Sequence, residues 1–273
     1  MTNYKSFHIE DWLFVLQGKG RLTFSLEELC LEASPVSLEA IKLSLNRLVN
    51  KNKIVSVHRG YYVIVPPSYQ NLATLPPIYF IDGLMNFLKR PYYVGLTNAA
   101  ALYGATQQQP QSFYVVSTLP ALRPTIKKGL LIQYLNIKNF PNQLFIEQRK
   151  TETGYVNISS AELTATDLIQ YEKRIGGLNR AATILNELAD EIQIPKLNQA
   201  FLATIPVVTI QRLGYLMDVI LERNDIAQKL YTESEAMGNT FFRIPLKASK
   251  TMKNYALNEK WKVVVNTEIE IDE

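Results

Sequence analysis

Cysteine and histidine are scarce in this sequence, which has one cysteine, Cys30, and two histidines, His8 and His58, among its 273 residues. A single thiol cannot form an internal disulfide, and the pattern does not indicate an oxidising compartment. These three side chains are too few for a common zinc site. We therefore expect no disulfide framework and no bound metal.

Long apolar runs and a strong net charge are also missing. No stretch of about 18 apolar residues is present, so no membrane-spanning helix is predicted. The first ten residues lack the apolar core of a secretory signal, and we expect a cytoplasmic protein. The formal charge is only +4. Any affinity for nucleic acid must therefore come from a local basic surface.

Common catalytic motifs are absent as well. The sequence contains neither G-x-x-x-x-G-K-[ST] nor a G-x-G-x-x-G that follows a strand, so no phosphate-binding loop is predicted. The two histidines are poorly placed for a serine triad, and Cys30 lies in an apolar stretch where it is better interpreted as a small hydrophobic residue. We expect no catalytic residue and no cofactor.

The composition is that of an ordinary globular protein, with 47% hydrophobic and 20% charged residues, and the length favours two domains. Paired prolines mark residues 67–77 as a linker. The predicted fold class is α+β. We expect a winged helix-turn-helix domain at 1–66 and a larger domain at 78–273, which is mixed α/β to about residue 192, then mainly helical, with strands at its end.

The first 66 residues follow the order of a winged helix. Helical spacing covers 9–17, and Ser25 with Glu28 forms a capping box for a second helix to about residue 33. A third helix ends near Asn50. Two strand-like runs, 53–57 and 61–64, are joined by a glycine turn and predict a β-hairpin. The expected buried stripe of the third helix comprises Leu38, Ile41, Leu45 and Leu48.

Basic and amide side chains gather on the other side of that third helix and at the hairpin tip. Residues 1–66 hold eight Lys and Arg against six Asp and Glu, and the basic ones concentrate where a DNA groove would lie. The alternatives are a solvated helix face or a protein-binding winged helix. The predicted DNA-binding residues are Ser37, Lys42, Asn46, Arg47, Lys51, Lys53, Arg59 and Tyr61.

Secondary-structure periodicity continues through the rest of the chain. Strands are predicted near 112–117, 130–135, 143–148 and 154–158, with extended segments at 241–244 and 261–265. Helices are predicted at 78–88, 96–103, from 160, 181–192, 197–203, 209–221 and 226–235.

Several acids raise the question of catalysis. Glu147 with Arg149 or Lys150, together with Asp82, loosely resembles the acidic and basic pattern of metal-dependent nucleases, but a second converging carboxylate is not evident. Glu162 and Asp167 lie five residues apart on one helix and do not share a face well. We expect them in solvated or capping positions.

A basic cluster near the C-terminal end has few acids around it. It could bind DNA phosphates or an acidic protein surface, or it could be a flexible solvated loop. Its members are Arg243, Lys247, Lys250, Lys253, Lys260 and Lys262.

The ordered motifs resemble the AbiEi family of antitoxins over nearly the whole chain. The wing runs into Val65-Pro66-Pro67, and Tyr92 to Gly104 is similar to the family's YYVGLxSAAxLHG stretch, with Tyr103 in place of the histidine. Arg123 precedes the strand at 129–135. Ser160 to Leu168 is similar to S-x-E-x-T-x-x-D-L, and Gly176-Gly177 and a terminal strand at 261–266 follow.

This resemblance implies two activities. The winged helix would bind inverted repeats in the promoter of its own operon and repress it, and the C-terminal region would counteract a nucleotidyltransferase-like toxin of an abortive-infection, phage-defence system without a stable complex. The rival hypotheses are a ligand-responsive winged-helix repressor and, with less support, a metal-dependent nuclease. Inverted repeats would require two copies of the winged helix.

Overall fold

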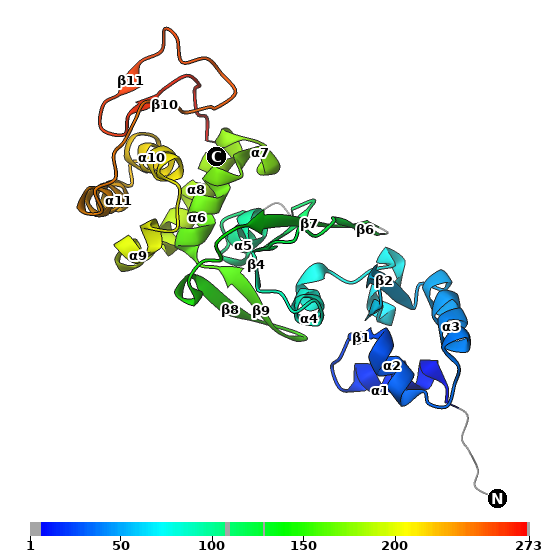
Figure 1. Cartoon of the computed structure of the whole chain (residues 1–273). Coiled ribbons are helices and arrows are strands. Elements are labelled where there is room, and N and C mark those ends of the chain that lie inside the picture. Colours follow the sequence, from blue (N-terminus) through cyan, green and yellow to red (C-terminus); the bar gives the residue numbers. More distant parts are fainter. Residues whose placement is uncertain (1–6, 107–109, 128, 272–273) are drawn as a thin grey trace, which may run out of the picture. The chain divides into compact units, whose positions relative to one another are not determined.

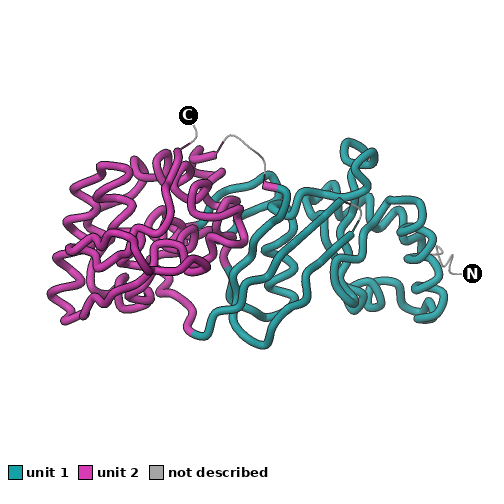
Figure 2. Tube along the Cα trace, turned by 90° about the horizontal axis from the view of Figure 1, so that it is seen from above, with its two compact units in different colours: residues 1–92, 111–138, 148–157 teal, residues 93–110, 139–147, 158–273 magenta. Residues whose placement is uncertain are grey.

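The structure is a computed structural model that describes residues 7–106, 110–127 and 129–271. Its contacts divide the chain into two compact units, which Figure 2 distinguishes by colour. Unit 1 comprises residues 1–92, 111–138 and 148–157, and unit 2 comprises residues 93–110, 139–147 and 158–273. Helices occur together with a mixed sheet, so the predicted fold class, α+β, is confirmed.

The N-terminal part of unit 1 has the elements expected of a winged helix-turn-helix (Figure 1). Its three strands form an antiparallel sheet of order β1-β3-β2, in which β2 and β3 are the hairpin. The elements are α1 (Ile9–Gly18), β1 (Thr23–Ser25), α2 (Leu26–Glu32), α3 (Leu38–Asn50), β2 (Ile54–His58) and β3 (Tyr61–Ile64).

Side-chain caps and an apolar core fix these helices, as the sequence predicts. Ser25 Oγ accepts a hydrogen bond from the Glu28 N–H at 3.0 Å, so the expected N-cap of α2 is present. Ile41 and Leu45 are each 1% exposed within the core. Leu38 was expected beside them but is 42% exposed. Leu38 is the first residue of α3, and the buried residues of this helix begin at Ile41.

Residues 67–77 contain local structure. Helix η1 (Pro67–Leu72) is a 3-10 helix that begins at a proline, where the missing N–H leaves no donor unsatisfied. Leu75 is 1% exposed and packs in the interior. Each of the two units is built from three separate segments of the sequence, whereas the predicted domains 1–66 and 78–273 are continuous. The predicted boundaries stay a prediction.

A six-stranded sheet has the order β6-β7-β5-β4-β9-β8. Strands β5 and β7 pair in parallel from Phe113–Ile132 to Thr118–Ile137, and β6 forms an antiparallel hairpin with β7. The predicted strand at 143–148 starts three residues late because Gln143–Phe145 forms the 3-10 helix η3. The strands are β4 (Tyr92–Val94), β5 (Phe113–Thr118), β6 (Thr125–Lys127), β7 (Leu130–Ile137), β8 (Ile146–Thr151) and β9 (Gly154–Ser159).

Helices dominate unit 2, and α6 lies among them. Every residue from 161 to 169 is buried, because α5, α8 and α10 all pack against α6. The α-helices are α5 (Leu96–Leu102), α6 (Ala161–Gln170), α7 (Glu172–Ile175), α8 (Leu178–Leu188), α9 (Gln199–Leu202), α10 (Val207–Tyr215) and α11 (Asn224–Ala236). The other helices there include the 3-10 helices η4 (Ala189–Glu191) and η5 (Ile194–Lys196) and the π-helix η6 (Leu216–Ile220), while η2 (Pro77–Tyr79) and α4 (Ile81–Phe87) belong to unit 1.

The C-terminal strands are anchored by a buried tryptophan. Trp261 is fully buried, and its Nε1 donates to Asp218 Oδ2 at 2.8 Å. Gly214 on α10 permits this packing, since a Cβ there would lie 2.1 Å from Trp261 Cζ3. The three short strands are β10 (Ile244–Pro245), β11 (Leu257–Asn258) and β12 (Val263–Val264). Across the described ranges, no helix is both long and apolar enough to cross a bilayer.

Candidate nucleic-acid interface and a buried polar network

Helix α3 presents hydrogen-bond donors to solvent on the side opposite its buried stripe. Lys42 and Asn46 are exposed and lie one turn apart on the same face. Neither side chain forms a hydrogen bond or an ion pair with another described residue, so both are accessible to base edges or phosphates. Ser37 Oγ accepts a hydrogen bond from the Ala40 N–H at 3.3 Å. Its hydroxyl therefore caps the helix, which leaves phosphate binding to backbone N–H groups of the first turn.

The basic residues at the end of α3 face the start of α1. Arg47 and Lys51 line a hollow of about 580 Å³ together with Glu10 and Asp11. Lys53 Nζ pairs with Glu10 Oε2 at 2.6 Å, and the hydrogen bond from Lys53 lowers the pKa of the Glu10 carboxyl. Because this pair is exposed, it is weak and a DNA phosphate could replace it. The exposed cations on this flank thus have acids of α1 close by.

Arg59 and Tyr61 are close in sequence at the hairpin tip, but they differ in exposure. Arg59 is exposed in the turn, where Gly60 adopts φ +75°. Tyr61 is only 4% exposed, and its ring centroid lies 5.0 Å from that of Phe87 on α4. Burial raises the pKa of the Tyr61 hydroxyl to about 12.

The prediction that Tyr61 contacts DNA is therefore corrected, since a side chain enclosed between the wing and α4 cannot reach a duplex. The alternation of side chains along a strand does not predict which face of the hairpin a later helix covers. The packing of α4 determines that the face with Tyr61 is buried.

The C-terminal basic cluster is divided by its contacts. Lys260 pairs with Asp218 at 3.0 Å and lies 5.5 Å from the ring centroids of Tyr231 and Trp261. Lys262 pairs with Glu259 at 2.7 Å. The more exposed members are Arg243, Lys250 and Lys253, and Lys247 is half-buried.

The loop that carries Lys247, Lys250 and Lys253 is held by a buried amide, which does not fit the flexible-loop alternative. Asn266 is fully buried, and its Nδ2 donates to the carbonyls of Lys247, Lys250 and Thr251 at 3.0–3.1 Å. Its Oδ1 accepts the Lys247 N–H at 2.9 Å. The loop backbone therefore has a defined course, on which Lys253 is exposed and Lys250 Nζ lies 3.3 Å from Thr267 Oγ1.

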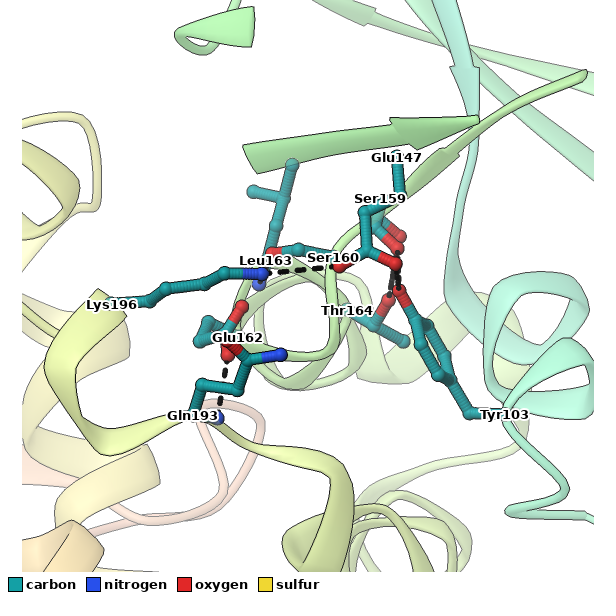
Figure 3. A network of polar contacts seen from close by, with 9 residues as sticks. All are labelled: Tyr103, Glu147, Ser159, Ser160, Glu162, Leu163, Thr164, Gln193 and Lys196. Atoms are coloured by element: carbon teal, nitrogen blue, oxygen red, sulfur yellow. Dashed lines mark hydrogen bonds and ion pairs between the residues drawn. The ribbon is translucent and has the colours of Figure 1, made fainter. Parts of the chain in front are cut away.

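Polar side chains converge in unit 2 around the start of α6 (Figure 3). Tyr103 Oη lies 3.0 Å from both Glu147 Oε2 and the Ser159 carbonyl, and Lys196 Nζ pairs with Glu147 Oε1 at 3.2 Å. Ser159 Oγ and Thr164 Oγ1 are 2.6 Å apart. Tyr103, which stands in place of the family's histidine, thus joins α5 to β8 and β9.

The two acids of α6 are buried, so the expected solvated or capping positions are wrong. Glu162 is 1% exposed, and its Oε1 accepts the Gln193 N–H at 2.7 Å. Its Oε2 has no partner within the described part of the chain. Asp167 is 5% exposed and accepts a hydrogen bond from the Tyr93 hydroxyl at 3.1 Å.

Burial raises the pKa of Asp167 to about 7, despite the opposing effect of the Tyr93 hydrogen bond. The sequence carried one signal for these positions: residues 160–169 contain two acids and no basic residue. An exposed helix face usually carries charges of both signs.

The nuclease hypothesis requires carboxylates that converge on a metal. Glu147 is instead bound to Tyr103 and Lys196, and Asp82 Oδ1 accepts the Tyr92 hydroxyl at 2.8 Å. Within residues 7–106, 110–127 and 129–271, no group of three or more His, Cys, Asp and Glu side chains could hold a metal ion.

Comparisons with known proteins agree with the C-terminal motifs. Residues 93–219 match a family model described as the AbiEi antitoxin C-terminal domain. The crystal structure of the RV2827C protein from Mycobacterium tuberculosis is similar over 93% of this chain and 91% of that one, with a TM-score of 0.65 and 14% identity. At that identity the similarity shows a shared fold alone. No curated protein matches the sequence.

Proposed function

Residues 93–219 match the AbiEi antitoxin C-terminal domain, and from this premise we propose that the chain is an antitoxin that also represses its own operon. The family match is the observation that carries the antitoxin role. The proposed site of action is the cytoplasm, where the operon and the toxin would both be present. The toxin would be nucleotidyltransferase-like and would be counteracted without a stable complex.

Operator binding is proposed for unit 1. The supporting observation is that Lys42 and Asn46 on α3 and Arg59 at the wing tip are exposed together, whereas the apolar faces of the same elements are buried. A recognition helix in the major groove and a wing tip at the backbone or minor groove use these side chains. Because one winged helix covers about one half-site, two copies would occupy an inverted repeat.

Counteraction of the toxin is proposed for the C-terminal region. Lys250 and Lys253 are exposed cations on the loop that Asn266 holds, and Arg243 is an exposed cation just before β10. They lie beyond the residues matched by the family model, so their role as a toxin-facing surface is a separate proposal. An acidic patch on a partner would be complementary to them.

The decisive experiment separates the two activities in the full-length protein. Lys42→Ala/Arg59→Ala should weaken binding to a duplex carrying the promoter of its operon at least tenfold, since each lost base or phosphate contact removes roughly 1–3 kcal/mol. Growth rescue against the co-expressed neighbouring reading frame should be unchanged. Arg243→Ala/Lys250→Ala/Lys253→Ala should show the reverse pattern.

Lys173→Ala/Arg180→Ala is the matched control, because it removes two exposed positive charges from unit 2 outside both proposed surfaces. It should retain operator binding and rescue. A harmless neighbouring reading frame, or a lack of rescue by the wild type, would contradict the antitoxin role. Loss of both activities in a folded Lys42→Ala/Arg59→Ala variant would contradict the separation of operator binding from rescue.

A further inference from the structure

A basic groove lies directly beside the wing in unit 1. It has a volume of about 490 Å³ and is lined by Val57 and His58 from β2, by the segment 121–124 and by β6. Figure 1 shows β6 next to β2, and the two strands are in contact. Arg59 follows His58 at once, so the tip of the wing and the groove are continuous along the chain.

The charge of the groove is of one sign. Arg123 and Lys127 line it together with His58, and no Asp or Glu is among the lining residues. Both cationic side chains are exposed and form no ion pair or hydrogen bond with a described residue. Several other cations of the chain are paired, as Arg21 is with Glu28 at 2.7 Å. Two unpaired cations around an acid-free groove favour an anionic occupant.

The groove has a defined shape because its wall is attached to the sheet and to the wing. Thr125 is 9% exposed, and its Oγ1 lies 3.4 Å from both the Val57 carbonyl and Tyr134 Oη. Arg90 Nη1 donates to the carbonyls of Thr118 and Pro120 and so fixes the start of the segment that leads to Arg123. Antiparallel pairing with β7 completes the support of β6.

We propose that Arg123 and Lys127 extend the DNA-binding surface, with the duplex backbone running from the wing tip along this groove. The inference rests on the proposed binding of DNA by α3 and the wing. Val57, whose carbonyl contacts Thr125, precedes Arg59 by two residues, a span of about 7 Å along a strand. This is close to the spacing of consecutive phosphates, so a strand held at Arg59 passes the groove within one or two nucleotides.

A polymer fits this site better than an enclosed small molecule. Arg123, Lys127 and Ile126 are exposed, Ile126 by 72%, so the wall of the groove that they form is open to solvent. Pockets for small ligands usually bury most of the ligand surface. An Arg and a Lys on an open wall can bind successive phosphates, and because they read no base they strengthen binding to any sequence.

The test measures the salt dependence of DNA binding by full-length Arg123→Ala/Lys127→Ala. Two probes are used, a duplex with the promoter of its operon and an unrelated duplex of the same length. Each lost phosphate contact should reduce the slope of log Kobs against log[salt] by about 0.9. The expected change is therefore about 1.8 in slope and roughly 60-fold in affinity at 0.1 M salt, by a similar factor on both duplexes.

Arg123→Lys/Lys127→Arg keeps both charges and should restore the wild-type slope. Lys173→Ala/Arg180→Ala lowers the net charge by the same amount and should leave the slope unchanged. Unfolding transitions of all variants are compared to exclude loss of the fold. Hydroxyl-radical footprints should show that Arg123→Ala/Lys127→Ala loses protection on the flank beside the wing and keeps protection at the recognition helix.

The outcomes distinguish this inference from the function on which it rests. If the wild type binds neither duplex, the proposed DNA binding fails, and this inference fails with it. If the wild type binds and Arg123→Ala/Lys127→Ala has the same slope and affinity, the groove is no part of the interface while operator binding stands. An unchanged slope, with stabilisation by AMP that only the wild type shows, would assign the groove to a small anionic ligand and overturn the inference.

Discussion

Asp167 makes the stability of unit 2 depend on pH, and replacing it with asparagine should remove that dependence. The carboxyl is buried against Tyr93, and burial raises its pKa from 3.8 to about 7. Asparagine has nearly the same shape, and its Oδ1 can still accept the Tyr93 hydroxyl. The substitution therefore removes one titrating group with little change in volume.

The sign follows from the two protonation states. Between pH 3.8 and about 7, the folded protein holds a proton on Asp167 that the unfolded chain has released, so the free energy of unfolding falls as pH rises. Below pH 3.8 both states are protonated, and above pH 7 both are ionised. At 1.36 kcal/mol per pKa unit, the loss across this range is roughly 4 kcal/mol. Tyr93 and Tyr171 face the carboxyl, but burial raises the pKa of both hydroxyls, so neither titrates in this window.

Urea denaturation between pH 4 and pH 8 measures the effect. The chain has two tryptophans, and Trp12→Phe leaves Trp261 as a fluorescent probe within unit 2. In this background, Asp167→Asn should gain roughly 4 kcal/mol relative to Asp167 between pH 4 and pH 8. Any constant penalty from the new amide donors cancels in that difference. A free-energy difference that is independent of pH would refute the buried, proton-binding carboxyl.

Three further predictions concern packing. Gly214→Ala should lower the free energy of unfolding by about 1–3 kcal/mol or more in thermal melts, because its Cβ would overlap the Trp261 ring. Gly18→Ala is the control, since the space around its Cβ position is open, and it should be nearly neutral. Asn266→Ala should speed trypsin cleavage after the loop lysines at least tenfold, since three carbonyls lose their donor, and an unchanged rate would mean that the loop is held otherwise. Tyr61→Phe should keep operator affinity within about twofold because the hydroxyl is buried, and a larger loss in a folded variant would return Tyr61 to the DNA interface.

Local signals in the sequence were sufficient for the winged helix. Ser25 and Glu28 mark the start of α2, glycine marks the wing turn, and the spacing of apolar residues identifies α3. These features depend on neighbours within a few residues, so they can be recognised from the sequence without the tertiary structure. The same reasoning identified Lys42, Asn46 and Arg59, since an exposed face is the complement of a buried stripe.

The tertiary structure decided which faces are covered. Periodicity gives a helix one polar and one apolar side, but α6 is enclosed by helices from distant parts of the chain, so Glu162 and Asp167 are buried. The same cause encloses Tyr61, because α4 packs against the wing. The groove at Arg123 and Lys127 is also tertiary, since it exists only where β6 meets β2. The sequence by itself thus determined the local elements and the donors of α3 and the wing, while burial, ion pairing and the shape of the groove required contacts between residues far apart in the chain.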